Sequence, residues 1–344
     1  MNFEQILNQY DYDFPTSAIA QEPASPRDSA KMFVYDRASH EITHNKFLNL
    51  VDHIPNNAVI VFNQTRVIPA RLTLKKPTGG KAIILYLEAL KNTIKVLSDR
   101  KLNIGETLKL NSKTSFKITK QDGQYYFLKP SFDIKKIQSI LEKYGDVPIP
   151  PYIKHSPLTQ IELKEKYQTV FAKQKGSVAA PTASLHFSKR LLTKIKKRGI
   201  TMAYVTLHVN QGTFATLKEE NLQTGKLHSE WYEIDAKTQK LLNKAKKDER
   251  PIIAVGTTVV RTLESASNTK GEISKATGTT NLFIKPGYKF KFIDQIITNF
   301  HVPKSSLLML VAAFVGREQI LSLYKIAIAK KYKLFSFGDG MYIK

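Results

Sequence analysis

Three histidines lie where predicted strands end, which is where α/β proteins place reactive side chains. His186 closes the small-residue segment GSVAAPTASLHFS, His208 lies in TLHVNQGTF, and His301 lies in TNFHVPKSS. A fourth, His228, stands two residues before Glu230 in GKLHSEWYEI. Imidazoles and a nearby carboxylate are suited to general acid–base chemistry. A single histidine is more often a structural residue than a catalyst. We therefore treat the four histidines and Glu230 as candidates and do not rank them.

The spacing of these histidines argues against a metal centre. His186, His208 and His301 form no His-x-x-x-His pair, and no carboxylate stands at ligand spacing from these three. The chain contains no cysteine, which excludes disulfides, thiolate zinc sites and a cysteine nucleophile. We therefore expect no metal, and a metal-dependent hydrolase that uses the histidines is the less favoured alternative.

Two further segments could bind an anion where a strand passes into a helix. In VGTT, Gly256 permits close approach, Thr257 or Thr258 is predicted to cap the helix, and Arg261 follows in its first turn. In HVPKSS, Lys304 and Ser305 occupy the equivalent place before an apolar helix. Free N–H groups there attract phosphate or carboxylate, although a plain capped helix with a surface arginine is an equally simple interpretation.

The elements that must position these side chains follow from hydrophobic periodicity. AVIVFNQTRVIPARL predicts a buried strand and a polar elbow flanked by Arg66 and Arg71, and residues 72–130 are almost purely β in pattern. After VPIPPYI, strands alternate with helices. The sequence thus predicts an α/β domain with a mixed sheet, residues 1–71 plus 148–344. An antiparallel β-barrel-like domain is inserted at residues 72–147.

The charge of the chain favours a polyanionic partner. Its 344 residues include 53 Lys and Arg against 29 Asp and Glu, a net charge of +24. A Lys-rich proteome would also explain that excess. Basic stretches such as SKRLLTKIKKRG could follow a phosphate backbone, although each is more simply a solvated helix face. The aromatics of KFL, YYF and FSFGDGMYI are mostly core residues by the same reasoning, although one exposed ring could stack on an extruded base. We expect a cytoplasmic protein, because neither a signal peptide nor an apolar run of membrane-spanning length is apparent.

Twelve segments in order, spanning residues 13–341, resemble the signature blocks of the S-adenosylmethionine:tRNA ribosyltransferase-isomerase family. Such an ordered set is highly specific. The segments are FPTSAIAQEPASPRD, NQTRVIPARL, PTGGK, IPPYI, YQTVFA, GSVAAPTASLHFS, HVNQGTF, HSEWYEI, VGTTVVRTLES, LFIKPGY, ITNFHVPKSSLLMLVAAFVG and FSFGDGM.

The resemblance implies a reaction. The family transfers and isomerises the ribosyl group of S-adenosylmethionine onto 7-aminomethyl-7-deazaguanine at the wobble position of tRNA, which gives epoxyqueuosine, adenine and methionine. It implies no metal or redox cofactor, with S-adenosylmethionine as a substrate and the tRNA anticodon stem-loop as the partner. We further expect a monomer that does not associate with membranes.

The resemblance also directs the site prediction. A base must remove the C5′ proton next to the sulfonium, adenine must be stabilised as it leaves, and the deazaguanine amine must lose a proton to attack. His186, His208, His228, Glu230 and His301 lie in matching blocks and are the catalytic candidates. The predicted substrate-binding residues are Arg66, Arg71, Thr182, Gly212, Thr213, Thr257, Thr258, Arg261, Asn299, Lys304 and Ser305.

The chain departs from the family pattern at several motif positions. Gln64, Ile83 and Asn281 replace a carboxylate that the family usually carries. Val259 and Gly340 replace the usual Ser and Ala, and Asn210 and Gln211 replace small residues. A diverged RNA-binding paralogue, with an altered substrate or no turnover, is therefore the alternative function.

Overall fold

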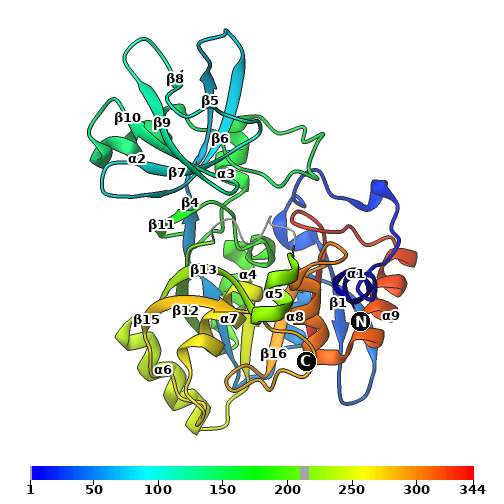
Figure 1. The fold of residues 1–344 in the computed structure, drawn as a ribbon. Helices are drawn as coiled ribbons and strands as arrows, with labels where there is room; N and C mark the ends of the chain where they lie inside the picture. The colour runs from blue at the N-terminus through cyan, green and yellow to red at the C-terminus, as the bar shows by residue number, and fades with distance from the viewer. Residues whose placement is uncertain (1, 210–216) are drawn as a thin grey trace.

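A computed structural model describes residues 2–209 and 217–344 (Figure 1). Among these residues, helices and strands follow one another in the order that an α/β chain with an inserted β-segment requires. The strands are β1 (Lys31–Tyr35), β2 (Ile42–Lys46), β3 (Val59–Asn63), β4 (Thr65–Val67), β5 (Arg71–Lys75), β6 (Lys81–Ala89), β7 (Ile94–Ser98), β8 (Thr107–Lys109), β9 (Ser115–Asp122), β10 (Tyr125–Pro130), β11 (Gln174–Ser177), β12 (Thr201–Leu207), β13 (Lys226–Glu233), β14 (Ile252–Val255), β15 (Thr277–Leu282), β16 (Gln295–Asn299) and β17 (Gly340–Ile343). The α-helices are α1 (Phe3–Asn8), α2 (Ile137–Tyr144), α3 (Gln160–Lys166), α4 (Lys189–Lys197), α5 (Glu219–Thr224), α6 (Ala236–Lys247), α7 (Thr257–Ala266), α8 (Ser306–Val315) and α9 (Arg317–Ala329). Short 3-10 helices are η1 (Thr16–Ala18), η2 (Arg27–Ser29), η3 (Phe47–Asp52), η4 (Ile134–Lys136) and η5 (Thr182–His186).

The larger sheet is mixed, as predicted. In the described residues it has nine strands in the order β15-β13-β12-β3-β14-β16-β17-β1-β2. Its centre is parallel, because β12 and β14 both pair in parallel with β3, and β16 pairs in parallel with β14. The carboxyl ends of these four strands therefore meet at one edge, where the loops that follow them converge.

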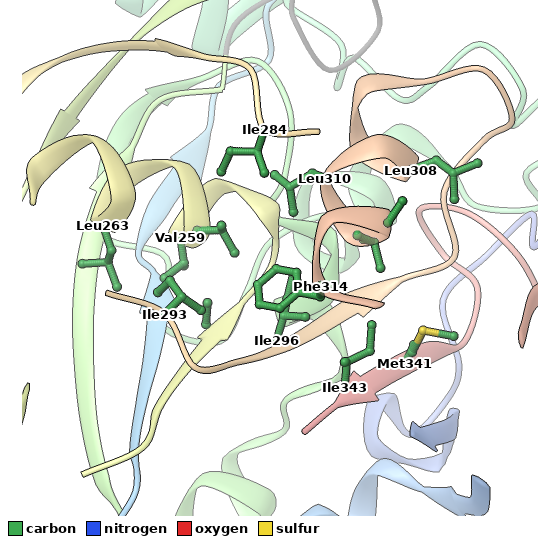
Figure 2. Close-up of a cluster of buried hydrophobic side chains, with 14 of the residues drawn as sticks. Val259, Leu263, Ile284, Ile293, Ile296, Leu308, Leu310, Phe314, Met341 and Ile343 are labelled. Carbon is green, nitrogen blue, oxygen red and sulfur yellow. The ribbon is translucent and has the colours of Figure 1, made fainter. Parts of the chain in front are cut away.

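The central strands are mostly apolar because both faces of the sheet are covered. Along β3, Val59 and Val61 face one buried cluster, whereas Ile60 and Phe62 face the other. Helices α7 and α8 cover the first face through Val259, Leu263, Leu308, Leu310 and Phe314 (Figure 2). The sheet is thus a rigid base for the loops at its edge.

The inserted segment closes into a barrel with its own core. Six strands pair in the order β10-β7-β6-β5-β8-β9, and residues such as Leu72, Ile84 and Phe116 fill the interior. Helix α2 packs on this core through Ile137 and Leu141. The expected barrel-like insertion is therefore confirmed, while the boundaries at residues 72 and 147 stay a prediction.

The two parts of the chain meet around a short parallel pair, β4 with β11. A separate apolar cluster surrounds this junction and includes Val67, Val147, Tyr167 and Phe337. In Figure 1 the barrel stands beyond the carboxyl edge of the large sheet, with β4 and β11 between them. The pocket described below therefore lies on the side of the sheet that faces the barrel.

No single helix in residues 2–209 and 217–344 has both the length and the apolar character needed to cross a bilayer. The consecutive helices α8 and α9 meet that test only as a pair, and they are bent by 106° relative to each other.

Candidate active site

A pocket lies at the edge where β12, β14 and β16 end. Its wall combines the start of α7 at Gly256, Thr257 and Thr258 with the segment after β16 that contains His301. The small residues of the loop before α4 form another side. Strand ends and a helix start thus converge where ligands bind in open α/β sheets.

Helix α7 presents its N-terminus to this pocket. Gly256 is the N-cap residue, with φ 90°, a conformation that strains any residue with a Cβ. The prediction that Thr257 or Thr258 caps α7 is wrong: within the described residues, no side chain accepts a capping hydrogen bond. The Thr258 hydroxyl accepts instead from Asn63 Nδ2 at 3.3 Å. The first N–H groups of α7 therefore remain directed at the pocket, ready for an anion.

Arg261 points away from that opening and into the protein. Its guanidinium forms an ion pair with Glu230 and donates to the carbonyls of Leu282 and Thr280 at 3.2 and 3.4 Å. Arg261 is 7% exposed and Glu230 only 1%. The described pocket wall includes neither residue. This buried pair joins α7 to β13 and β15, so it orients the helix rather than offering a free charge.

Asn299 connects two of the candidate residues. Its Oδ1 accepts from the Thr182 hydroxyl at 2.9 Å, and its Nδ2 lies 3.3 Å from His186 Nε2. Thr182 and Asn299 line the pocket, whereas His186 lies behind them, stacked on Phe47 with ring centroids 4.1 Å apart. Burial, with a smaller effect from the charge of Arg27, lowers the pKa of His186 to about 3. Its imidazole is therefore neutral at pH 7 and reaches the pocket only through Asn299.

His301 itself lines the pocket. Its Nε2 lies 2.8 Å from the Thr298 hydroxyl, its backbone N–H donates to Tyr324 Oη at 2.9 Å, and its carbonyl accepts from Tyr12 Oη. Burial lowers its pKa to about 3, so the ring is an uncharged proton acceptor at neutral pH. Of the predicted histidines, His301 is the one that the pocket wall contains.

His208 and His228 lie outside the part of the pocket that the structure describes. His208 is stacked on Trp231, and its Nδ1 lies 2.8 Å from the Thr65 hydroxyl. A Cβ at Gly176 would come within 2.7 Å of the His208 ring, which explains the glycine there. Burial lowers the pKa of both imidazoles, and Lys218 adds to the effect on His228.

Known proteins resemble this chain over nearly its whole length. A family model described as queuosine biosynthesis protein matches residues 7–343. Proteins named S-adenosylmethionine:tRNA ribosyltransferase-isomerase are 43% identical in Carboxydothermus hydrogenoformans, over 98% of this chain and 99% of the relative, and 42% identical in Fusobacterium nucleatum, over 98% and 96%. The crystal structure of S-adenosylmethionine tRNA ribosyltransferase from Thermotoga maritima aligns with a TM-score of 0.56 at 30% identity, covering 98% of this chain and 100% of that one. The chain belongs to the S-adenosylmethionine:tRNA ribosyltransferase-isomerase family.

Five of the positions that differ from the usual motifs of this ribosyltransferase-isomerase family are absent from the described pocket wall. Ile83 and Asn281 are on exposed strand positions, and Val259 is in the core. Gln64 Nε2 donates to the Thr206 hydroxyl at 3.4 Å. A Cβ at Gly340 would lie 2.6 Å from the Phe47 ring, so Phe47 occupies the space that the alanine methyl group would need at this position. Asn210 and Gln211 lie outside the described residues.

The remaining predicted binding residues are dispersed. Lys304 forms an ion pair with Asp11 at 2.8 Å, and Ser305 caps α8 as predicted. Arg66 is exposed on β4, and Arg71 donates to the Ile149 carbonyl at 3.1 Å. Gly212 and Thr213 lie outside the described residues. The structure therefore brings together Thr182, Thr257, Thr258, Asn299 and His301.

Three polar pocket residues were missed by the sequence analysis. Tyr152 Oη and Ser336 Oγ are 2.6 Å apart across the opening, and Thr298 holds the His301 ring. Tyr152 lies in IPPYI and Ser336 in FSFGDGM. Their place in segments that resemble the family was the one sequence feature that could have indicated these residues. No group of three or more His, Asp or Glu residues within the described ranges could hold a metal ion.

Proposed function

We propose that this chain transfers and isomerises the ribosyl moiety of S-adenosylmethionine to 7-aminomethyl-7-deazaguanine at the wobble position of tRNA. The products are epoxyqueuosine, adenine and methionine. The observation that carries this proposal is the pocket, which brings the uncapped start of α7 together with the neutral His301. None of the described residues of its wall is a position that differs from the family motifs. That wall argues against a diverged, non-catalytic paralogue.

The methionine carboxylate of the substrate fits the start of α7. The N–H groups there carry partial positive charge, and Thr257 and Thr258 add hydroxyl donors. The role of Arg261 in this proposal is to hold α7 against β13 and β15 through Glu230, because its own guanidinium is already occupied.

We assign the base that removes the C5′ proton to His301. It borders the pocket and is uncharged at neutral pH because burial disfavours its protonated form. The same burial weakens the imidazole as a base, so the assignment rests on its position at the pocket and not on its pKa. Asn299 and Thr182 are placed to hydrogen-bond the departing adenine or the ribose, with His186 fixing the amide from behind. In this scheme His208, His228 and Glu230 support the neighbouring elements.

The tRNA partner is proposed to present its anticodon stem-loop, with the wobble base extruded toward the pocket. The net charge of +24 favours such an encounter. We propose that the protein acts as a monomer in the cytoplasm and that, as its family membership implies, it needs no metal or redox cofactor.

The direct test is to incubate the protein with S-adenosylmethionine and tRNA that carries the deazaguanine. Chromatography and mass spectrometry then follow adenine and the modified nucleoside. We expect stoichiometric appearance of adenine and epoxyqueuosine. Folded protein that binds the tRNA in a salt-sensitive manner but releases no adenine would overturn the enzyme assignment in favour of an RNA-binding paralogue.

A further inference from the structure

The outer face of the barrel carries two aromatic rings between lysines. On β10 the side chains alternate, so Tyr126 and Leu128 fill the barrel while Tyr125 and Phe127 stand half-buried on its outside. Phe127 is paired with Lys95 of β7 on one side and with Lys120 of β9 on the other. We call Lys95, Lys120, Tyr125 and Phe127 the aromatic wall.

The two lysines lie over the two rings. Lys95 Nζ is 4.4 Å from the centroid of Tyr125, and Lys120 Nζ is 5.3 Å from that of Phe127. Their carboxylate partners, Glu88 at 3.3 Å and Asp122 at 3.7 Å, are themselves largely exposed. Exposed pairs of this kind contribute little energy, so a phosphate group can replace either carboxylate at small cost.

The aromatic wall lies close to the domain that holds the pocket. His228 belongs to β13 of the large sheet, yet Lys95 of the barrel is near enough for its charge to lower the pKa of that imidazole, after burial and Lys218. Lys218 and Lys95 thus place positive charge near His228 from both domains, whereas Glu230 is buried and already paired with Arg261. A nucleic acid that enters here would contact the barrel and the sheet domain at the same time.

We propose that the aromatic wall binds unpaired nucleotides of the tRNA anticodon loop: Lys95 and Lys120 move off the rings to contact phosphates, and bases stack on the faces of Tyr125 and Phe127 that this exposes. This inference rests on the proposed function and adds to it the surface that holds the RNA beside the reacting base. Rings interleaved with cations are the means by which proteins bind single-stranded nucleic acid without reading its sequence.

An unpaired loop suits this surface better than a duplex does. The bases of a duplex are stacked on one another and offer no free face to an aromatic ring, whereas loop bases can unstack onto protein. The wall carries two rings separated by one residue along β10, enough for consecutive bases. Stacking then contributes to affinity independently of the charge term.

The test measures binding of a fluorescently labelled anticodon stem-loop RNA by anisotropy at several salt concentrations. The double variant Tyr125→Leu/Phe127→Leu should bind about ten-fold more weakly with the same salt dependence. The double variant Lys95→Gln/Lys120→Gln should reduce the log–log salt slope by about two, one for each phosphate contact. In turnover assays the loss should fall on KM for tRNA, with KM for S-adenosylmethionine unaltered.

The matched control is Lys244→Gln, because Lys244 on α6 is 75% exposed and also pairs with an aspartate, Asp248, at 2.8 Å. It should change neither the affinity nor the slope. A fully paired RNA hairpin stem of the same length should bind the aromatic double variant as well as the parent protein. Thermal melting by circular dichroism verifies that the barrel of each variant is folded.

Unchanged loop affinity in a folded aromatic double variant would overturn the proposal, as would an equal loss toward the paired stem. Because binding is measured without turnover, the two proposals fail separately. Absent adenine release from the parent protein contradicts the proposed reaction, whereas the aromatic wall is contradicted only by the binding data.

Discussion

His301 is the residue on which the proposed chemistry depends most directly. Its backbone N–H and carbonyl are hydrogen-bonded to Tyr324 and Tyr12, and its ring is held by Thr298. Such a side chain has little freedom to move when substrate binds. Geometry of this kind is what a base requires, since proton transfer depends on a fixed donor–acceptor distance.

We therefore predict that His301→Gln lowers kcat for adenine release by about 10²- to 10⁴-fold, the usual contribution of a general base, while KM for S-adenosylmethionine changes little. Steady-state kinetics with saturating tRNA measure this. His155→Gln, at an exposed histidine, is the control and should behave as the parent. If His301→Gln raises KM and leaves kcat intact, the residue binds substrate and is not the base.

Asn299 is predicted to act as a unit with Thr182. Asn299→Ala removes the partner of the Thr182 hydroxyl and of His186 Nε2, so it should raise KM for S-adenosylmethionine about ten-fold. Thr182→Val should have a smaller effect, and the double variant should cost less than the sum because both changes remove one hydrogen bond. Calorimetric titration of S-adenosylmethionine gives the coupling. Strict additivity would show that the two residues act separately.

Among the elements, α7 most clearly combines stability with binding. Its start faces the pocket, and its body is fixed by Arg261 and Glu230 beneath β15. A buried ion pair of this kind is costly to break from one side, because the remaining charge stays buried without its partner.

Arg261→Met is accordingly expected to lower the free energy of unfolding by about 3–5 kcal/mol. The combined change Arg261→Met/Glu230→Leu should recover much of that loss, since no unpaired carboxylate remains. Urea denaturation of both variants and of the parent measures these differences. A double variant that regains stability yet loses all affinity for S-adenosylmethionine would mean that Arg261 contacts the substrate directly.

Helices begin where the local sequence predicts when a capping residue precedes them. Ser188 and Ser305 accept the capping hydrogen bonds of α4 and α8, as a serine before an amphipathic or apolar run predicts. The start of α7 did not follow this rule, because Gly256 adopts φ 90° and its threonines turn toward the pocket. That exception is at the candidate site, where the uncapped N–H groups are available for the anion that we propose binds there.

At the scale of the whole molecule, the two buried neutral histidines link stability to pH. His186 and His301 both have a pKa of about 3 when folded, against about 6.5 in an unfolded chain. The unfolded chain thus binds more protons below pH 6.5. Their stabilising effect is complete above that pH and is lost progressively as the pH falls toward 3.

Between pH 8 and pH 5 we expect each of these histidines to reduce the free energy of unfolding by about 2 kcal/mol. Denaturant melts at a series of pH values measure this slope. The variant His186→Gln should lose only the contribution of His186, about 2 kcal/mol, from this pH-dependent change, while His40→Gln, at an exposed position, should leave the change as in the parent. A parent protein whose stability is constant over this interval would contradict the burial of both rings.

The sequence by itself determined the architecture and the set of motifs. The β pattern of residues 72–130 predicted the barrel, and the alternation of strands and helices after residue 153 predicted the mixed α/β sheet. Both are local patterns. Tertiary structure alone decided which candidate side chains share a pocket. Arg261 pairs with Glu230, and His186 lies behind Asn299, because packing brings together residues that are far apart in the chain. Local sequence patterns do not indicate which distant residues will pair or how deeply each will be buried.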